Sequence, residues 1–164
     1  MSNKKEKSGL LLIDKPQGPT SHDIVDKIRE ITGVKKVGHT GTLDPQAEGL
    51  LILLIGRNAT KKQSDFLNLD KEYQATIKLG EETDTLDAQG ETTNIYEGDW
   101  PDQEEISSLL DNFRGGYHQV PPAYSAKRVD GEKAYKLARK GEEPELEPEK
   151  VKIYELELIN YSVP

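Results

Sequence analysis

The chain has 164 residues, a mass of 18.4 kDa, no cysteine and a mean hydropathy of −0.75. These values indicate one soluble cytoplasmic domain and exclude a disulfide framework, thiolate chemistry and a membrane span of roughly 20 apolar residues. Three scattered histidines make a dedicated metal site unexpected. The net charge is −8, but the charged residues are unevenly distributed. Residues 1–64 hold 11 Lys or Arg and 7 Asp or Glu, whereas residues 65–164 hold 11 Lys or Arg and 23 Asp or Glu. Ordinary solvated charge and a basic face for a nucleic acid both fit this distribution.

The first quarter of the chain predicts a strand followed by a helix. Residues Gly9–Asp14 form a short apolar run that ends in a turn rich in proline and glycine. Thr20 or Ser21 can cap the helix, and Gly33 suits its end. Its apolar face is expected to comprise Ile24, Val25, Ile28 and Ile31.

Residues 37–49 contain three glycines and show no amphipathic period. They predict a long loop, and long loops in small domains are often functional. The run Leu50–Ile55 then predicts a buried strand. A short helix should follow, from a cap at Asn58 through Phe66.

The second half of the chain again mixes strand and helix patterns. A strand is predicted at Tyr73–Leu79, before an acidic loop at residues 80–90. A helix capped by Asp102 should bury one apolar face and end at a pair of glycines. That face is expected to comprise Ile106, Leu109, Leu110 and Phe113. Three further elements are expected: an extended Val120–Ser125, a basic helix in Gly131–Lys140 and a strand at Val151–Tyr161.

Asp44 is the first candidate for chemistry, because it stands in the predicted loop as Gly-Thr-Leu-Asp-Pro. Pro45 restricts the preceding residue to an extended geometry, which would orient a nucleophilic carboxylate in advance. The same pattern also fits an ordinary Asx-type turn.

His39 and Tyr73 each allow two interpretations. A loop histidine such as His39 can contact a substrate or be a plain turn residue. Tyr73 can pack in a sheet or present its ring to a nucleobase.

The segment Val37–Leu51 (VGHTGTLDPQAEGLL) resembles the catalytic motif of the TruB family of tRNA pseudouridine synthases. Further segments resemble that family's other motifs, in the same order along the chain. They are Gly9–Ser21, Lys71–Gly80 with Thr83–Gly90, Phe113–Gly116, Val120–Ala126 and Arg128–Gly141.

The resemblance implies a role for each matching residue. Asp44 corresponds to the catalytic aspartate, and Tyr73 to the tyrosine that stacks on the target base and assists proton transfer. His39 corresponds to the histidine that contacts RNA around the flipped nucleotide. Lys15 and Pro16 correspond to residues that support the catalytic loop.

The resemblance also implies an α+β fold with a mixed or antiparallel sheet flanked by helices. The implied activity is isomerisation of a uridine in the T loop of tRNA, at tRNA position 55, without metal or organic cofactor. The T-stem loop of tRNA is the implied partner. A non-catalytic RNA-binding or RNA-folding module, and the same chemistry on another RNA, are the competing functions.

The sequence departs from the family in lacking its downstream Lys-Gly-x-Tyr-Ile-Arg segment, whose arginine pairs with the catalytic aspartate, and its C-terminal PUA domain. Residues 1–164 are therefore expected to be the N-terminal portion of a catalytic domain. Lys15 and Lys71 are the candidate substitutes for the arginine, although an ammonium cannot form a bidentate fork. We expect little or no activity from the chain alone. The open edge of its last strand invites a second polypeptide, or a second copy of the chain, to complete the sheet.

Overall fold

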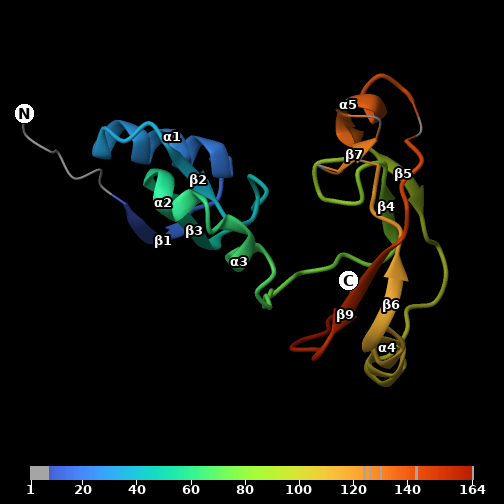
Figure 1. Cartoon of the computed structure of the whole chain (residues 1–164). Coiled ribbons are helices and arrows are strands. Elements are labelled where there is room, and N and C mark those ends of the chain that lie inside the picture. The colour runs from blue at the N-terminus through green and yellow to red at the C-terminus, as the bar shows by residue number, and fades with distance from the viewer. Residues whose placement is uncertain (1–7, 124, 126, 130, 143, 164) are drawn as a thin grey trace, which may run out of the picture. The chain divides into compact units, whose positions relative to one another are not determined.

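The computed structural model describes residues 8–163 apart from 124, 126, 130 and 143 (Figure 1). The chain divides into two compact units, Met1–Ala75 and Thr76–Pro164. Helices and antiparallel strands alternate in both, so the expected α+β class is confirmed. The longest helix among the described residues has 12 residues, and none there is long and apolar enough to cross a bilayer.

The described part of the first unit contains three strands and three helices. They are β1 (Gly9–Lys15), α1 (Ser21–Thr32), β2 (Val37–His39), β3 (Gly49–Ile55), α2 (Gly56–Thr60) and α3 (Gln63–Leu67). The strands form one antiparallel sheet in the order β1-β3-β2. The predicted strands at residues 9–14 and 50–55 are both present.

Helix α1 begins and ends where its sequence predicts. The Thr20 hydroxyl accepts a hydrogen bond from the Asp23 backbone N–H, and the Asp23 carboxylate accepts one from the Thr20 backbone N–H, which completes a capping box. The Thr20 hydroxyl also donates to the Asp23 carboxylate, and this bond, together with the one from the Thr20 backbone N–H, holds the pKa of Asp23 below its ordinary value. Gly33 ends the helix at φ 68°, a left-handed conformation that glycine adopts without strain.

The core of the first unit lies between α1 and one face of the sheet (blue to green in Figure 1). Val25 and Ile28 of α1 are buried there, as predicted. Ile31 is instead 67% exposed. At 100° per residue it lies about 120° around the helix from Val25, so it falls at the margin of the apolar stripe. The buried cluster comprises Val25, Ile28, Val37, Leu51 and Leu53.

The helix predicted from Asn58 to Phe66 is two helices, and its predicted cap is wrong. Asn58 lies inside α2, which begins directly after β3 without a side-chain cap. Helix α3 begins at Gln63, after a short turn. The chain starts α2 immediately because Gly56 turns at φ 80°, a conformation that suits glycine.

The described residues of the second unit form three two-stranded antiparallel sheets and short helices. Strands β4 (Glu81–Thr83) and β5 (Thr92–Ile95) form a hairpin. Strand β4 lies inside the acidic loop predicted at residues 80–90, and β5 begins just after that loop. The remaining elements are α4 (Gln103–Leu110), the 3₁₀ turn η1 (Asp111–Phe113), β6 (Gly115–Gln119), β7 (Arg128–Val129), β8 (Glu132–Lys133), α5 (Ala134–Ala138) and β9 (Glu149–Ile153).

Helix α4 has the predicted cap, because Asp102 and Glu105 form a reciprocal capping box. Its predicted apolar face is only partly covered, since Leu109 is 55% exposed and Phe113 is 45% exposed. The basic helix expected in Gly131–Lys140 is present as the shorter α5. The extended segment Val120–Ser125 lies partly outside the described residues, because Tyr124 is one of those omitted.

Among the described residues, one predicted strand is absent and another is shorter than predicted. Residues 70–78, which include most of Tyr73–Leu79, have no regular secondary structure, and Tyr73 and Ile77 are 70% and 76% exposed. The strand expected over Val151–Tyr161 ends at Ile153 as part of β9. Alternating apolar residues form a strand only where a neighbour pairs with the backbone, and in the described part of the chain these residues have no such neighbour.

Candidate active site

The loop that carries Asp44 connects β2 to β3 in the first unit. Its first residue, Thr40, is buried, and the Thr40 backbone N–H donates to the Ile52 carbonyl at 3.0 Å. The Ala47 N–H donates to the Asp44 carbonyl at 3.1 Å and closes a turn in which Pro45 follows Asp44. The predicted loop is therefore present, although β2 occupies its first three residues, and it has a defined conformation.

The carboxylate of Asp44 is exposed and free of partners. It makes no hydrogen bond or ion pair within the described part of the chain. The Asp44 backbone belongs to the closed turn, while no described residue forms a hydrogen bond or ion pair with the side chain that would compete with a ligand. This combination suits a group that acts on something outside the protein.

Two hydrogen bonds from the start of α1 hold the peptide immediately before Asp44. The Ser21 hydroxyl donates to the Leu43 carbonyl at 2.9 Å and accepts from the Leu43 backbone N–H at 2.9 Å. Ser21 is 2% exposed, so water does not compete for these bonds. On the other side of Asp44, the Gly18 N–H donates to the Pro45 carbonyl at 2.7 Å.

Lys15 shapes the turn that supplies these contacts. Its side chain is completely buried, and its ammonium donates to the carbonyls of Pro16 at 3.0 Å and Pro19 at 2.9 Å. These bonds offset the cost of taking the charge out of water. Lys15 also pairs with Gly49, the residue that follows the loop, and Pro16 begins the turn whose Gly18 contacts the loop. Both described hydrogen bonds of the ammonium go to backbone carbonyls, so it does not substitute for a cation paired with Asp44.

Lys71 does not serve as that cation either. Its ammonium donates to the carbonyls of Leu67 and Leu69 at 2.9 Å and 2.8 Å and thereby caps the end of α3. The hypothesis that Lys15 or Lys71 replaces the family's arginine therefore finds no support in these contacts. Among the described residues, no cation pairs with Asp44.

His39 lies at the end of β2, five residues before Asp44, and pairs with Leu53 of β3. Burial of the imidazole lowers the pKa of His39; a backbone hydrogen bond with Gly41 opposes that shift, and the nearby His22 adds to it. The ring is therefore neutral at pH 7. Its Nδ1 is buried and has no hydrogen-bond partner in the described ranges. Gln63 of α3 donates to the His39 carbonyl at 2.7 Å and fixes the strand end.

Tyr73 follows α3 on the segment without regular structure. Its ring is 70% exposed and has no hydrogen-bond or ring partner within the described part of the chain. No contact joins it to the loop of Asp44 there. The structure thus places Lys15 and Pro16 at the start of the turn that contacts the loop through Gly18, and His39 on the strand that leads into the loop. Tyr73 bonds to none of these residues in the described part of the chain.

Sequence reasoning missed Ser21 and Gly18 as contacts of the loop. It considered Ser21 only as an alternative helix cap and Gly18 only as a turn residue. The available signal was the hydroxyl pair Thr20-Ser21. Because a helix needs one N-cap, which is Thr20, the second hydroxyl had to find a partner elsewhere once it was buried.

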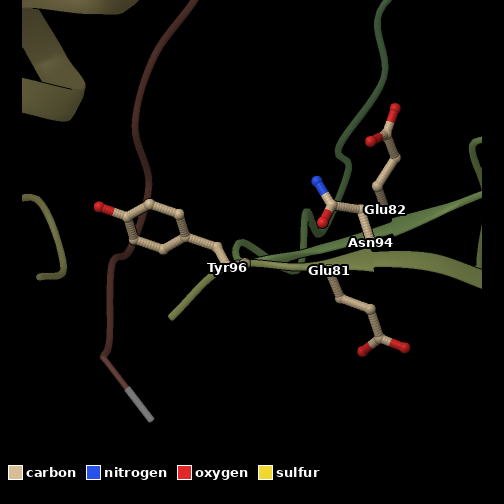
Figure 2. A pocket seen from close by; sticks show the side chains of 5 residues that line it. Glu81, Glu82, Asn94 and Tyr96 are labelled. Atoms are coloured by element: carbon tan, nitrogen blue, oxygen red, sulfur yellow. The ribbon is translucent and has the colours of Figure 1, made fainter. Parts of the chain in front are cut away.

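A separate hollow of about 220 Å³ lies on the β4–β5 hairpin of the second unit. Figure 2 shows Glu82 and Asn94 on one side of the hairpin and Glu81 on the other. A hydrogen bond from Lys78 holds the pKa of Glu81 below its ordinary value, so that the carboxylate is ionised at neutral pH. An acidic lining repels phosphate, so this hollow does not suit an RNA backbone. Across the described ranges, no group of three or more His, Cys, Asp or Glu residues is placed to hold a metal.

The chain belongs to the TruB family of pseudouridylate synthases. The model of that family's N-terminal domain matches residues 29–164, a range that includes His39, Asp44 and Tyr73. Curated relatives named tRNA pseudouridine synthase B are similar over nearly the whole chain. The Aquifex aeolicus protein is 48% identical over 93% of this chain and 52% of its own length. The Caldanaerobacter subterraneus protein is 51% identical over 95% of this chain and 54% of its own length. The chain thus spans about half the length of these relatives.

A solved structure supports the fold. A chain in the crystal structure of a Cbf5–Nop10–Gar1 complex superimposes with a TM-score of 0.57. The match covers 94% of this chain and 36% of that one at 24% sequence identity. At that identity the likeness concerns the fold alone.

Proposed function

We propose that this chain carries the catalytic loop of a tRNA pseudouridine synthase, an enzyme that isomerises uridine at position 55 in the T loop of tRNA. The names of its relatives support a tRNA substrate. One observation carries the assignment of the catalytic group: Asp44 presents an unpaired, exposed carboxylate from a backbone that its neighbours hold in place.

The reaction is an isomerisation, so atoms and electrons balance within the nucleotide. The glycosidic bond between C1′ and N1 breaks, the base rotates, a bond forms between C1′ and C5, and C5 loses its proton while N1 gains one. The Asp44 carboxylate either forms a covalent adduct with the nucleotide or removes a ribose proton. Both routes need the carboxylate next to the ribose, which a free side chain on a tethered loop can provide.

The uridine must leave its stack before the carboxylate can reach it. Unstacking costs a few kcal/mol, and stacking on an aromatic ring offsets about 1–3 kcal/mol per base. The exposed ring of Tyr73 is available for this contact. His39 is neutral, so it would contact RNA around the flipped nucleotide as a hydrogen-bonding group rather than as a charge.

Exposed Lys and Arg side chains in the first unit would bind the phosphates of the tRNA backbone. Five Lys or Arg side chains between α1 and α3 are exposed and form no ion pair with any described residue. They are Lys35, Lys36, Arg57, Lys61 and Lys62. Free cations of this kind are what phosphate contacts require, although they carry no sequence information.

The test compares Asp44→Asn with Glu48→Gln, a matched change of an exposed acid in the same loop. Both are made in the chain alone and in a chimera that adds the C-terminal half of the Aquifex aeolicus relative. We expect conversion of tRNA uridine by the chimera and little or none by the chain alone, which lacks a described cation beside Asp44. Asp44→Asn should lower the conversion rate by about 10²–10⁴-fold or more. It should leave tRNA binding intact, whereas Glu48→Gln should change neither.

Each alternative has its own outcome. A wild-type chimera that binds tRNA and never converts it would identify an RNA-binding module instead. Conversion of another RNA in preference to tRNA would identify the same chemistry on a different substrate. Efficient conversion by the chain alone would overturn the expectation that it needs a further segment.

A further inference from the structure

We propose that Ser21 is a positioning residue that sets the direction of the Asp44 carboxylate, an inference that rests on the proposed function. Ser21 is the first residue of α1 and lies 22 positions before Leu43 in the sequence, yet its hydroxyl contacts both backbone polar groups of Leu43. Asp44 itself has no side-chain partner among the described residues, so its direction follows from its backbone.

The geometry of the two bonds explains how Ser21 acts on the next residue. The Leu43 carbonyl, which accepts from the Ser21 hydroxyl, belongs to the same planar peptide group as the Asp44 nitrogen. Because the Leu43 N–H is also bound to that hydroxyl, the peptide planes on both sides of Leu43 are fixed. The Asp44 α-carbon, which carries the side chain, lies in the peptide plane between Leu43 and Asp44. Fixing that plane therefore limits the directions in which the side chain can point.

A third bond limits the other side of Asp44. The Gly18 N–H donates to the Pro45 carbonyl at 2.7 Å, and the proline ring fixes its own φ. Gly18 lies in the turn between β1 and α1, which the buried ammonium of Lys15 bonds at two backbone carbonyls, and Ser21 is the first residue of α1 after that turn. Hydrogen bonds from Ser21 and Gly18 therefore fix the loop backbone at the residues immediately before and immediately after Asp44.

The helix does not need the Ser21 hydroxyl. Thr20 and Asp23 already cap α1 through a complete capping box. Both described hydrogen bonds of the Ser21 hydroxyl go to the loop, and at 2% exposure it has no water to replace them. Loss of the hydroxyl should therefore affect the loop and leave the helix intact. Because a misplacement of about 1 Å at a reacting group can cost about 10²-fold in rate, a small local shift is enough to affect catalysis.

The test uses Ser21→Ala, Ser21→Thr and the matched control Thr32→Val. Thr32 lies at the other end of α1 and makes the same kind of bridge, because its hydroxyl donates to the Ile28 carbonyl at 2.6 Å and accepts from the Val34 N–H at 3.3 Å. Amide hydrogen exchange of Leu43 is measured in the chain itself. The single-turnover conversion rate and tRNA affinity are measured in the chimera described above.

We expect Ser21→Ala to speed exchange at Leu43 by at least about 10-fold and to slow conversion by about 10–10²-fold. The tRNA affinity should stay within about twofold, because the phosphate contacts are unchanged. Ser21→Thr, which keeps the hydroxyl, should restore most of the rate. Thr32→Val should leave both the Leu43 exchange and the conversion rate near wild type.

Two results would overturn the inference while the proposed function stands. One is an unchanged conversion rate in Ser21→Ala. The other is an equal loss of rate in Ser21→Ala and Thr32→Val, which would mean that α1 stability, and not the loop contact, matters. A wild-type chimera that converts no uridine would overturn the proposed function and this inference together.

Discussion

The loop at residues 40–48 and the segment at residues 70–78 both lack regular secondary structure, but they differ in how their backbones are held. The loop begins at a buried Thr40 and is bonded to the first residue of α1 before Asp44 and to the turn preceding α1 after Asp44. The segment carries the exposed Tyr73 and Ile77 and pairs with no strand among the described residues. Bonds to the rest of the fold therefore hold the irregular backbone of residues 40–48, whereas no such pairing holds residues 70–78 in the described part of the chain.

The same contrast appears in the two lysines beside these regions. Lys15 and Lys71 each donate from their ammonium to two backbone carbonyls at 2.8–3.0 Å. Lys15 is completely buried, whereas Lys71 is exposed. The two contacts are alike in chemistry and differ in their access to water, so they offer a direct comparison of the two regions.

The largest effect is expected from removal of the buried ammonium. Lys15→Met leaves the Pro16 and Pro19 carbonyls without their donor and should lower the free energy of unfolding by about 2–4 kcal/mol. Lys71→Met, the matched change at the exposed site, should lower it by less than about 0.5 kcal/mol, because water replaces the lost donor. Urea denaturation followed by circular dichroism measures both. Equal losses in the two variants would contradict the distinction between the regions.

A smaller effect, on RNA rather than on stability, is expected at Tyr73. Tyr73→Ala should weaken the interaction of the chimera with tRNA by about 1–3 kcal/mol, the contribution of one stacked base. Its free energy of unfolding should hardly change, because the ring is already exposed. Tyr73→Phe retains the stacking face and should bind tRNA as the wild type does. Unaltered tRNA affinity in Tyr73→Ala would remove the proposed role of the segment in holding the base.

The smallest effect is a pH dependence at the entrance to the loop. Burial lowers the pKa of His39 below its ordinary 6.5, so the unfolded chain takes up this proton more readily than the folded chain does. The contribution of His39 to the free energy of unfolding should therefore be fully present above pH 6.5. It should be lost as the pH falls from there through the lower pKa of the folded state. His39→Gln should flatten this part of the profile, measured by urea denaturation at a series of pH values. A variant with the same slope as the wild type would show that His39 is not the group responsible.

Much of the first unit was predictable because its signals are local. Thr20, Asp23 and Gly33 define α1 through bonds to residues three or four positions away. The apolar run of β3 is buried because it is continuous and strand-sized. The position of Asp44 in a loop before that strand followed from its glycines and from Pro45. In each case the residues that determine the structure lie within one turn or one strand of each other.

Two features of the fold could not be predicted from the sequence, and both have the same physical cause. Apolar and polar residues alternate in Tyr73–Leu79 as they do in a strand. A strand also needs a neighbouring strand to pair with, and the sequence of the segment does not show whether one is present. Lys15 is a charged residue that would normally be exposed, and its complete burial depends on carbonyls that the following turn directs toward it. Neither outcome follows from periodicity or composition.

By itself, the sequence determined the α+β class, the bounds of α1, the loop of Asp44 and the motifs that mark the family. Only the tertiary structure decided which groups hold that loop, because the Ser21 contact spans 22 residues and the Gly18 contact spans a turn, a helix and a strand. A hydroxyl or an amide can bond to any exposed backbone group, so its partner is selected when the chain folds and brings the two together. The sequence identified Asp44 as the candidate catalytic residue, and the tertiary structure decided which groups hold its backbone.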